Sequence, residues 1–391
     1  MPSPNLQALR DWIHAGDPVP PPLDRWLSVR VRSIQDPELR GQVSIRLHRF
    51  LGGVCARGIA GLGRLWGPDA AVARLTDPAA AFAALAAVER DFEKAIERPM
   101  RDVGPDVPLA FRLIAAGVPP WWAPALADRD PAWLSAWLPM QARRPPLWAW
   151  GDAEAAADLR AEGFEVRFEY GALRISGSHP VEGSSPYKEG RVEVQDLGSQ
   201  RVADRVGALP GEQVWDATAG TGGKTLRLAH FMGGKGAITA SDVDAVRLER
   251  LQKRVRRAGV QNVRALPWNG QAPFKLPREA AMRGGFDRVL LDAPCTGSGT
   301  WRRNPDARLR LAPVDGWTDV QHRLLGFAAM AVRPGGTLVY ATCSVWSEED
   351  EAVVARLLAA RPDLRLEHQG FEGAPEVDAD TLFVAVMVRE G

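Results

Sequence analysis

The segment "DATAGTGGKT" (residues 216–225) decides the fold of this 391-residue chain. It is a glycine-rich turn that follows an apolar run and opens a helical pattern. A phosphate-binding P-loop has a glycine, four free positions and then Gly-Lys-Ser/Thr, and here Thr218 replaces the first glycine. Gly220, Gly222 and Gly223 still allow positive φ angles and a close approach of the backbone to a ligand. The turn therefore predicts a ligand site that only half resembles a nucleoside-triphosphate cradle.

Around this turn, short apolar runs alternate with helical stretches. The apolar runs cover 212–217, 236–242, 262–267, 286–295, 336–344 and 381–388, and the helical stretches cover about 224–231, 244–258, 316–332 and 347–360. Continuous apolar runs bounded by turn residues are typical of strands buried on both faces of a parallel sheet. The pattern predicts an α/β fold with an open, doubly wound, Rossmann-like sheet over residues 191–391.

The first half of the chain has a different character. Residues 1–140 show helical spacing of apolar residues and many prolines, with arginines at 25, 30, 32, 40, 46, 49 and 57. Residues 141–190 read as a strand, an alanine-rich helix over 152–162 and two further strands. We therefore predict three domains: a helical domain (1–140), a small α/β subdomain (141–190) and the large α/β domain (191–391).

Composition excludes several classes of protein. Net charge is +1, so any nucleic-acid site must be a local patch. Three cysteines (55, 295 and 343) without a Cys-x-x-Cys motif argue against a disulfide framework and against a metal site. No apolar run reaches the roughly 20 residues of a membrane helix, and the N-terminus lacks the pattern of a signal peptide. We expect a cytoplasmic monomer that holds no metal and does not enter a membrane.

Polar residues follow the predicted strands at the edge where such sheets bind ligands. Asp242 ends the second strand, 20 residues after Gly222, where an acid can accept hydrogen bonds from a ribose diol. The pair favours an adenosine-bearing ligand, either S-adenosylmethionine or a dinucleotide. A tight turn followed by a helix-capping aspartate would explain the same residues without a ligand.

Two cysteines lie at the ends of strands that we expect to be neighbours. Asp292 and Cys295 lie in "LLDAPCTGSGTWRRNPD" (290–306), whose two adjacent arginines could hold phosphates, and Cys343 ends the apolar run "LVYATCS" (338–344). A single free cysteine is most often a buried apolar residue. Two cysteines at one sheet edge, beside a carboxylate and a glycine turn, instead indicate a catalytic site.

These blocks resemble those of the RNA (cytosine-5) methyltransferase family, which includes bacterial rRNA cytosine-5 methyltransferases and the eukaryotic NOL/NOP2/Sun proteins. "DATAGTGGKT" resembles the family's cofactor loop, "DAPCTGSGTWRRNPD" and "LVYATCS" resemble its two cysteine blocks, and "RVEVQDLGSQ" (191–200) resembles the segment before the loop. The resemblance covers roughly 145–391 and extends weakly to a NusB-like, RNA-binding accessory domain over 1–140. It implies a class I methyltransferase domain, S-adenosylmethionine as cofactor and RNA, particularly rRNA, as substrate.

The resemblance also implies roles for individual residues. Cys343 corresponds to the nucleophile that attacks carbon 6 of cytosine, and Cys295 to the residue that helps to eliminate the carbon 5 proton. Asp292 corresponds to the residue at ring nitrogen 3, and Lys224 to an active-site lysine. The implied cofactor-binding residues are Thr218, Ala219, Gly220, Thr221, Gly222, Gly223, Lys224, Asp242, Asn269 and Asp292.

The chain departs from the family pattern at the cofactor loop. Thr218, Gly220 and Thr221 stand where the family commonly has Cys, Ala and Pro, and Asn269 stands where an aspartate usually faces adenine. A non-catalytic rRNA-binding assembly factor on the same fold is therefore an alternative hypothesis. We expect the arginines of 25–57 to contact RNA. We expect the basic helix 244–258 to be a solvated outer helix instead.

Overall fold

The computed structural model describes residues 106–391 except 144, 178, 305, 306 and 310–313. Of the first 105 residues it describes 11, 26, 29, 35, 58–64, 66, 68–77, 80, 81, 83 and 84. The chain forms two compact units, one made of Met1–Arg144 and Thr300–Ala312, the other of Pro145–Gly299 and Pro313–Gly391. No helix among these described residues is long and apolar enough to cross a membrane.

The described elements of the first unit are short helices. They include α4 (Pro68–Arg74), α7 (Leu109–Ala115), η1 (Pro120–Trp122), α8 (Ala123–Leu126), α9 (Pro131–Trp137), η2 (Leu138–Ala142) and η5 (Ala307–Leu309). Prolines begin several of them, since a proline at the first turn removes no helical hydrogen bond. The arginines predicted to bind RNA (25, 30, 32, 40, 46, 49 and 57) lie outside the described residues, so the helical RNA-binding domain stays a prediction.

The segment after residue 300 completes the core of this first unit. The ring of Trp301 lies 5.8 Å from that of Trp122 and 6.0 Å from that of Trp137. Arg308 is almost fully buried, and its guanidinium donates to the carbonyls of Gly117, Gln141 and Trp301. Arg302, which the sequence suggested as a phosphate ligand, is buried and donates to the carbonyl of Arg143. Two arginines of the "TWRRNPDARL" stretch therefore stabilise the fold.

The second unit contains the predicted α/β sheet. Its strands are β5 (Gln213–Asp216), β6 (Ala237–Asp242), β7 (Val263–Pro267), β8 (Phe286–Asp292), β9 (Val332–Thr342), β10 (Leu364–Gly373) and β11 (Thr381–Arg389), in the order β10-β11-β9-β8-β5-β6-β7. The five strands β5 to β9 are parallel, as predicted. The final apolar run was wrongly predicted to be parallel: β11 pairs antiparallel with both β9 and β10.

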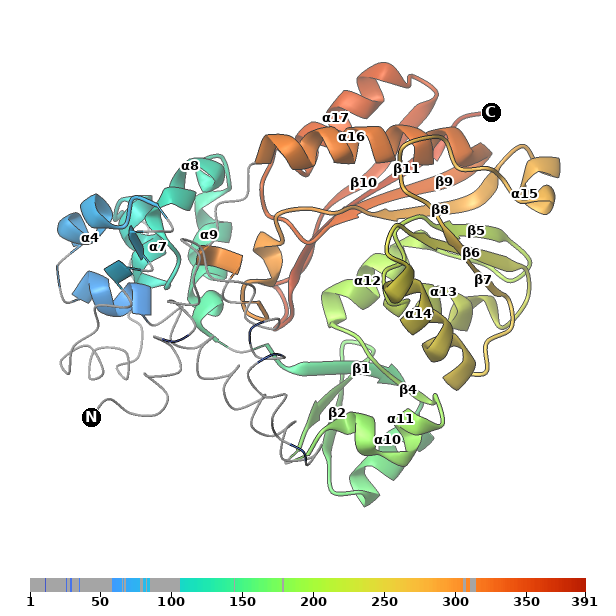
Figure 1. Ribbon diagram of the computed structural model, residues 1–391, viewed down its shortest axis with the longest axis horizontal. Helices are drawn as coiled ribbons and strands as arrows, with labels where there is room; N and C mark the ends of the chain where they lie inside the picture. Colours follow the sequence, from blue (N-terminus) through green and yellow to red (C-terminus); the bar gives the residue numbers. More distant parts are fainter. Residues whose placement is uncertain are drawn as a thin grey trace. The chain divides into compact units, whose positions relative to one another are not determined.

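Helices cover both faces of this sheet, which explains why its central strands are mostly buried, whereas the edge strands β7 and β10 are partly exposed. α16 (Val314–Ala331) and α17 (Glu351–Ala360) lie on one face, and α12 (Leu197–Val206), α13 (Gly223–Met232) and α14 (Ala245–Arg257) on the other (Figure 1). Successive strand residues point to opposite faces. Leu291 therefore packs into the core under α16 and α17, while Leu290 packs into the core under α12 and α13.

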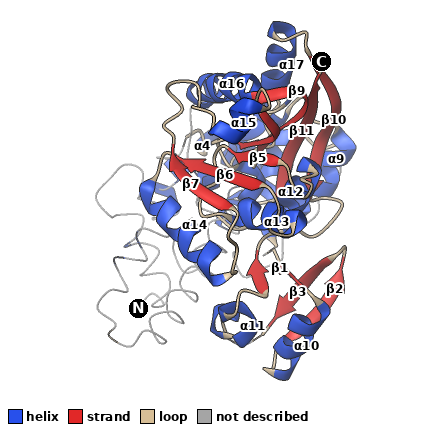
Figure 2. Ribbon diagram, turned by 90° about the vertical axis from the view of Figure 1, so that its right-hand side faces the viewer, coloured by secondary structure: helices blue, strands red, loops and turns tan. Residues whose placement is uncertain are grey.

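A second, smaller sheet lies beside the large one within the same unit (Figure 2). It contains β1 (Leu147–Gly151), β2 (Glu165–Glu169), β3 (Ala172–Ser176) and β4 (Val192–Val194) in the order β2-β3-β1-β4, with α10 (Ala153–Ala161) after β1. The strand-helix-strand-strand pattern was predicted, but the fourth strand comes from residues beyond 190. Two indoles fix this sheet in place: Trp148 donates to the carbonyl of Asp378, and Trp150 donates to Gln195.

The glycine turn meets α13 at Gly222, the residue that caps the helix. Its φ is +90°, a left-handed conformation that favours glycine. A Cβ atom added there would lie 2.8 Å from Cγ of Leu251 on α14. The turn therefore requires glycine both for its backbone angle and for the contact with α14.

We expect Gly222→Ala to destabilise the protein more than Gly233→Ala. Gly233 is also left-handed, with φ of +56°, but a Cβ atom there meets nothing within 4 Å. The control should cost about 1–2 kcal/mol for the strained angle, and Gly222→Ala about 1–3 kcal/mol more for overpacking against Leu251. Urea unfolding of the two variants measures the difference. Equal losses of unfolding free energy would contradict the packing role of Gly222.

Candidate active site

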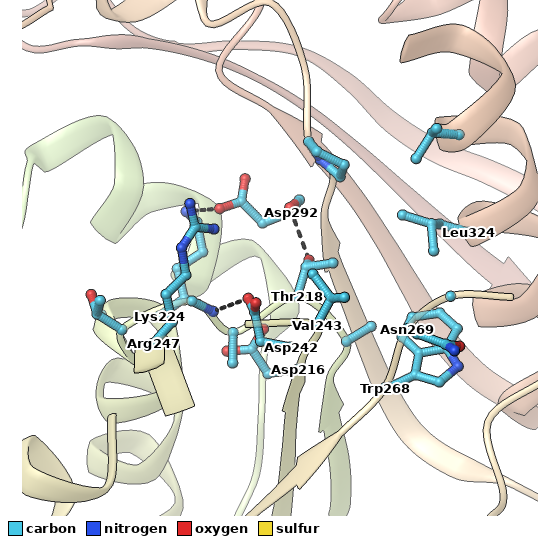
Figure 3. Close-up of a pocket in the computed structure, with 18 of the residues that line it drawn as sticks. Asp216, Thr218, Lys224, Asp242, Val243, Arg247, Trp268, Asn269, Asp292 and Leu324 are labelled. Atoms are coloured by element: carbon cyan, nitrogen blue, oxygen red, sulfur yellow. Dashed lines mark hydrogen bonds and ion pairs between the residues drawn. The ribbon is translucent and has the colours of Figure 1, made fainter. Parts of the chain in front are cut away.

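The carboxyl ends of β5, β6 and β8 form one pocket of about 440 Å³, a volume typical of small-molecule sites. Figure 3 shows Thr218, Lys224, Asp242 and Asp292 on one side of it and Trp268, Asn269 and Leu324 on the other. Nine of the ten residues predicted to bind the cofactor line this pocket: Thr218, Ala219, Gly220, Thr221, Gly223, Lys224, Asp242, Asn269 and Asp292. Gly222 does not, because it packs against α14.

Hydrogen bonds hold the glycine turn to the ends of two other strands. The Thr218 hydroxyl donates to the carbonyl of Asp292 at 2.8 Å, at the end of β8. The amide of Gly220 donates to Asp242 Oδ2 at 2.8 Å, and the amide of Asp244 donates to Asp242 Oδ1 at 2.9 Å. Each carboxylate oxygen can accept a further hydrogen bond. Asp242 thus shapes the turn and retains acceptor capacity toward the pocket.

Asp216 places a carboxyl group at the floor of the pocket. It is 1% exposed, and its Oδ2 accepts from the hydroxyl of Thr225 at 2.6 Å. Its other oxygen, Oδ1, is buried without a hydrogen-bond partner. Burial, the largest cause, raises the pKa of Asp216 to about 7, although Thr225 and the charge of Lys224 act in the opposite direction. A cationic group in the pocket would satisfy the unpartnered oxygen.

Lys224 and Asp292 form an ion pair on one side of the pocket, with Nζ 2.6 Å from Oδ2. Lys224 comes from the first turn of α13, and Asp292 ends β8. Burial alone would lower the pKa of Lys224, but the charge of Asp292 and its hydrogen bond raise it, and the charge of Cys343 adds to the increase. The lysine therefore stays cationic and lies within electrostatic reach of a cysteine.

The two predicted cysteines lie side by side. Cys295 follows β8 and Cys343 follows β9, and their sulfur atoms are 3.4 Å apart. Both side chains are half-buried, and neither lines the pocket itself. The hydrogen bond with Cys343 and burial raise the pKa of Cys295 well above its ordinary value. The protonated form of Cys295 is therefore favoured, and its sulfur lies within hydrogen-bond distance of the Cys343 sulfur.

A buried carboxylate that the sequence analysis missed holds the Cys295 loop. Glu349 is fully buried, and its carboxylate accepts from the amide and the hydroxyl of Thr296. Gln321 of α16 donates both to Glu349 and to the carbonyl of Pro294. Glu349 lies six residues after Cys343, and only this proximity in the sequence could have suggested it.

The wall of the pocket also contains residues from the loop after β7 and from α16, which lie far from the glycine turn in sequence. Arg323 donates from α16 to the carbonyl of Gly270, and the amide of Trp268 donates to the carbonyl of Asp242. The wall residues that sequence analysis did not assign to the cofactor are Ser199, Asp216, Ala217, Val243, Arg247, Trp268, Gly270, Pro294, Val320, Arg323 and Leu324. No local motif marks the α16 residues, because their approach depends on packing across the sheet.

Part of the basic helix α14 was wrongly predicted to face solvent. Arg254 and Arg257 both pair with Glu193 of β4, which is 2% exposed. Arg254 Nη1 also donates to the carbonyl and the hydroxyl of Thr221 in the glycine turn, at 3.0 and 3.2 Å. The guanidinium of Arg257 lies 3.9 Å from the centre of the Tyr187 ring. These two arginines join the small sheet to the back of the cofactor turn.

Comparison with known proteins places this geometry in a family. Residues 207–385 match the family model of the 16S rRNA methyltransferase RsmB/F. This segment belongs to the RsmB/F methyltransferase family. The matched residues include the glycine turn, both cysteine blocks and every strand of the large sheet except the last four residues of β11.

Curated relatives carry the same kind of name. The chain is 38% identical over 201 residues to a "probable ribosomal RNA small subunit methyltransferase B" of Synechocystis sp., covering 50% of this chain and 44% of that protein. It is 33% identical over 284 residues to the ribosomal RNA small subunit methyltransferase B of Xanthomonas campestris pv. campestris, covering 63% and 61%. The chain thus spans less than two thirds of the length of these relatives.

Solved structures share the fold. A crystal structure of a protein named PH0851 matches with a TM-score of 0.72 at 23% identity, covering 100% of this chain and 99% of that one. A methyltransferase homolog protein from Pyrococcus horikoshii matches with a TM-score of 0.58 at 24% identity, covering 71% and 97%. The predicted Rossmann-like methyltransferase fold is therefore confirmed.

S-adenosylmethionine is the cofactor of this methyltransferase family, and the pocket fits it. The ligand carries a ribose, an ammonium group and a sulfonium. Asp242 has acceptor capacity for the ribose, and the unpartnered Oδ1 of Asp216 suits a cation. Gly220, with φ of +54°, leaves open space where a Cβ atom would stand. The described residues contain no group of His, Cys, Asp or Glu side chains arranged to hold a metal ion.

We expect Asp216→Asn to change how stability depends on pH. Burial raises the pKa of Asp216 from 3.8 to about 7, so the folded protein binds this proton more tightly than the unfolded chain does. The contribution of Asp216 to the unfolding free energy is therefore greatest below pH 3.8 and is lost as the pH rises through 7. The unfolding free energy of the wild type should fall relative to Asp216→Asn by up to about 4 kcal/mol over that range. Urea unfolding from about pH 4 to about pH 8, without cofactor, measures this, and a constant difference would contradict the buried carboxyl.

Proposed function

We propose that this protein is an S-adenosylmethionine-dependent methyltransferase that methylates carbon 5 of a cytosine in ribosomal RNA through a covalent cysteine adduct. The observation that carries the proposal is the pair of sulfur atoms 3.4 Å apart, Cys295 and Cys343, beside the Lys224–Asp292 ion pair. The family match and the names of the relatives support RNA as the substrate. S-adenosylmethionine supplies an electrophilic methyl group when bound.

Cys343 is the proposed nucleophile. Carbon 5 of cytosine is a poor nucleophile until a thiolate adds to carbon 6, which converts the ring into an enamine. The positive charge of Lys224 stabilises negative charge on the Cys343 sulfur, and the thiol of Cys295 can donate a hydrogen bond to it. After methylation, loss of the carbon 5 proton breaks the bond between sulfur and carbon 6. The enzyme is then released unchanged.

Cys295 and Asp292 are proposed to assist the reaction without bonding covalently to the base. Cys295 is the proposed acceptor of the carbon 5 proton. Its thiol releases its own proton to solvent during the addition step, and because its pKa is raised, the resulting thiolate is a strong base. This thiolate takes the carbon 5 proton as the Cys343 sulfur leaves carbon 6, which restores both thiol groups to their starting state. Asp292 pairs with Lys224 and lines the pocket, and we assign to its carboxyl the hydrogen bond to ring nitrogen 3 that favours protonation there. The target base must be unpaired or flipped out of its stack to reach these groups.

The second candidate is a non-catalytic rRNA-binding assembly factor. The altered cofactor loop is the observation that favours it, since Thr218, Gly220 and Thr221 replace the residues common in the family. The two functions differ in one measurable property, which is the binding of S-adenosylmethionine. Calorimetric titration of the whole protein separates them, because an assembly factor without a cofactor would give no heat of binding.

Asp242→Ala should weaken S-adenosylmethionine binding. The substitution removes a charge-assisted hydrogen bond to the ribose, worth about 1.5–3 kcal/mol, which is a rise in Kd of about ten- to hundredfold. Asp242→Asn should lose less, because the amide oxygen can still accept from Gly220. Calorimetry on both variants measures the order. Unchanged affinity in Asp242→Ala would remove Asp242 from the cofactor site.

The two cysteines should give different products when each is replaced. Cys343→Ala forms no bond to carbon 6 and should be inactive. Cys295→Ala can still attack the base and transfer the methyl group, but it should stall before elimination and remain joined to RNA. A denaturing gel with labelled RNA and S-adenosylmethionine should show a slow band for Cys295→Ala only.

Cys55→Ala is the matched control for loss of a thiol elsewhere in the chain. It should methylate RNA normally and give no stalled band. A stalled band from Cys343→Ala in place of Cys295→Ala would reverse the two roles. Methylation by both variants without any band would end the catalytic assignment of these cysteines.

A further inference from the structure

The cations of α14 separate into two sets. Arg254 and Arg257 point to the small sheet and share the buried carboxylate of Glu193. The other set is Arg247, Arg250, Lys253 and Arg256, all of them exposed. These four residues repeat every third position, so they follow one i±3 row, which winds about halfway around the helix between Arg247 and Arg256. We call this row the basic ridge.

Few acidic side chains neutralise the positive charges of the basic ridge. Arg247 lies 3.6 Å from the helix-capping Asp244, while the other three cations form no hydrogen bond or ion pair with any described residue. Glu249 is the only acid within α14, and it makes no ion pair with the ridge in the described part of the chain. Like charges spaced three residues apart on a helix repel one another. A solvated helix normally mixes both signs, so this winding row of cations favours an external anion.

The ridge begins at the active site. Arg247 lines the cofactor pocket, and Arg250, Lys253 and Arg256 follow along α14 away from it. Val246 lies on the same exposed side and is 56% exposed. Because the chain has a net charge of only +1, a single-sign row on one helix is a local feature rather than part of a generally basic surface.

We propose that the basic ridge of α14 binds the phosphodiester backbone of the RNA substrate. This rests on the proposed function, since it assigns a docking surface for the same substrate. Lysine and arginine bind phosphates without reading sequence, so the ridge positions the strand while the cysteine site selects the base. Arg254 and Arg257 anchor the helix to β4, while Arg250, Lys253 and Arg256 stay exposed to solvent.

The test is the salt dependence of RNA affinity. The variant R250Q/K253Q/R256Q removes three ridge cations and leaves Arg247 in the pocket. The matched control K235Q/R278Q/R356Q removes three exposed cations outside α14. The probe is an unmodified 16S rRNA transcript, bound by each protein from about 0.05 to 0.3 M salt, roughly the range over which counterion release is measured.

The ridge variant should bind this RNA about ten- to hundredfold more weakly at about 0.1 M salt, and the slope of log K against log salt should fall by about 2. The control should bind like the wild type. Both variants should bind S-adenosylmethionine with unchanged affinity, which reports that the fold is intact. An unchanged slope in the ridge variant, or equal losses in both variants, would overturn the proposal while leaving the proposed function in place.

A second measurement needs no substitution. Acetylation of lysines by an N-hydroxysuccinimide ester, followed by mass spectrometry, should show that RNA protects Lys253 severalfold and leaves Lys235 unprotected. Equal protection of both lysines would overturn the ridge even if the triple variant failed to fold. A wild-type protein that neither binds nor methylates this RNA would instead overturn the proposed function, and the ridge with it.

Discussion

The ion pair between Lys224 and Asp292 is the interaction on which the rest of the site depends. It joins the start of α13 to the end of β8 with a distance of 2.6 Å, and the Thr218 hydroxyl adds a second link to the same residue. The glycine turn is thereby held against the strand that leads to Cys295. Because parallel strands end at one edge, this link places the cofactor pocket beside the cysteines. A cofactor loop held elsewhere would leave the thiols without a methyl donor.

The surroundings of Lys224 and of Cys295 favour one protonation state at each residue. Lys224 remains cationic because Asp292 outweighs the effect of its burial. One sulfur of the cysteine pair keeps its proton, since the hydrogen bond and burial raise the pKa of Cys295. Two thiols in identical surroundings would have the same pKa, and neither would be favoured as the protonated one. This asymmetry supports the proposal that the two cysteines have separate tasks, attack by Cys343 and proton transfer by Cys295, as in other sites where the environment separates two similar groups.

Sequence patterns predicted the parts of this molecule that depend on local order. Apolar runs predicted the strands, and the polar residues at their ends do converge on one pocket, because strand direction decides which ends meet. The antiparallel direction of β11 was missed, since an apolar run has the same appearance in either direction. The buried Glu349 and the inward arginines of α14 were also missed. Their burial depends on partners such as Thr296 and Glu193 that lie far away in sequence.

The departures of the cofactor loop from its family acquire a physical reading in this context. A threonine at 218 offers a hydroxyl donor, which bonds the carbonyl of Asp292, whereas a thiol is a weak donor. The amide of Gly220 donates a hydrogen bond to Asp242, and the guanidinium of Arg254 donates to the carbonyl and the hydroxyl of Thr221. Each changed residue takes part in a bond that fixes the turn. The loop is therefore held by different contacts around the same space, and its altered sequence is weak evidence for a lost cofactor site.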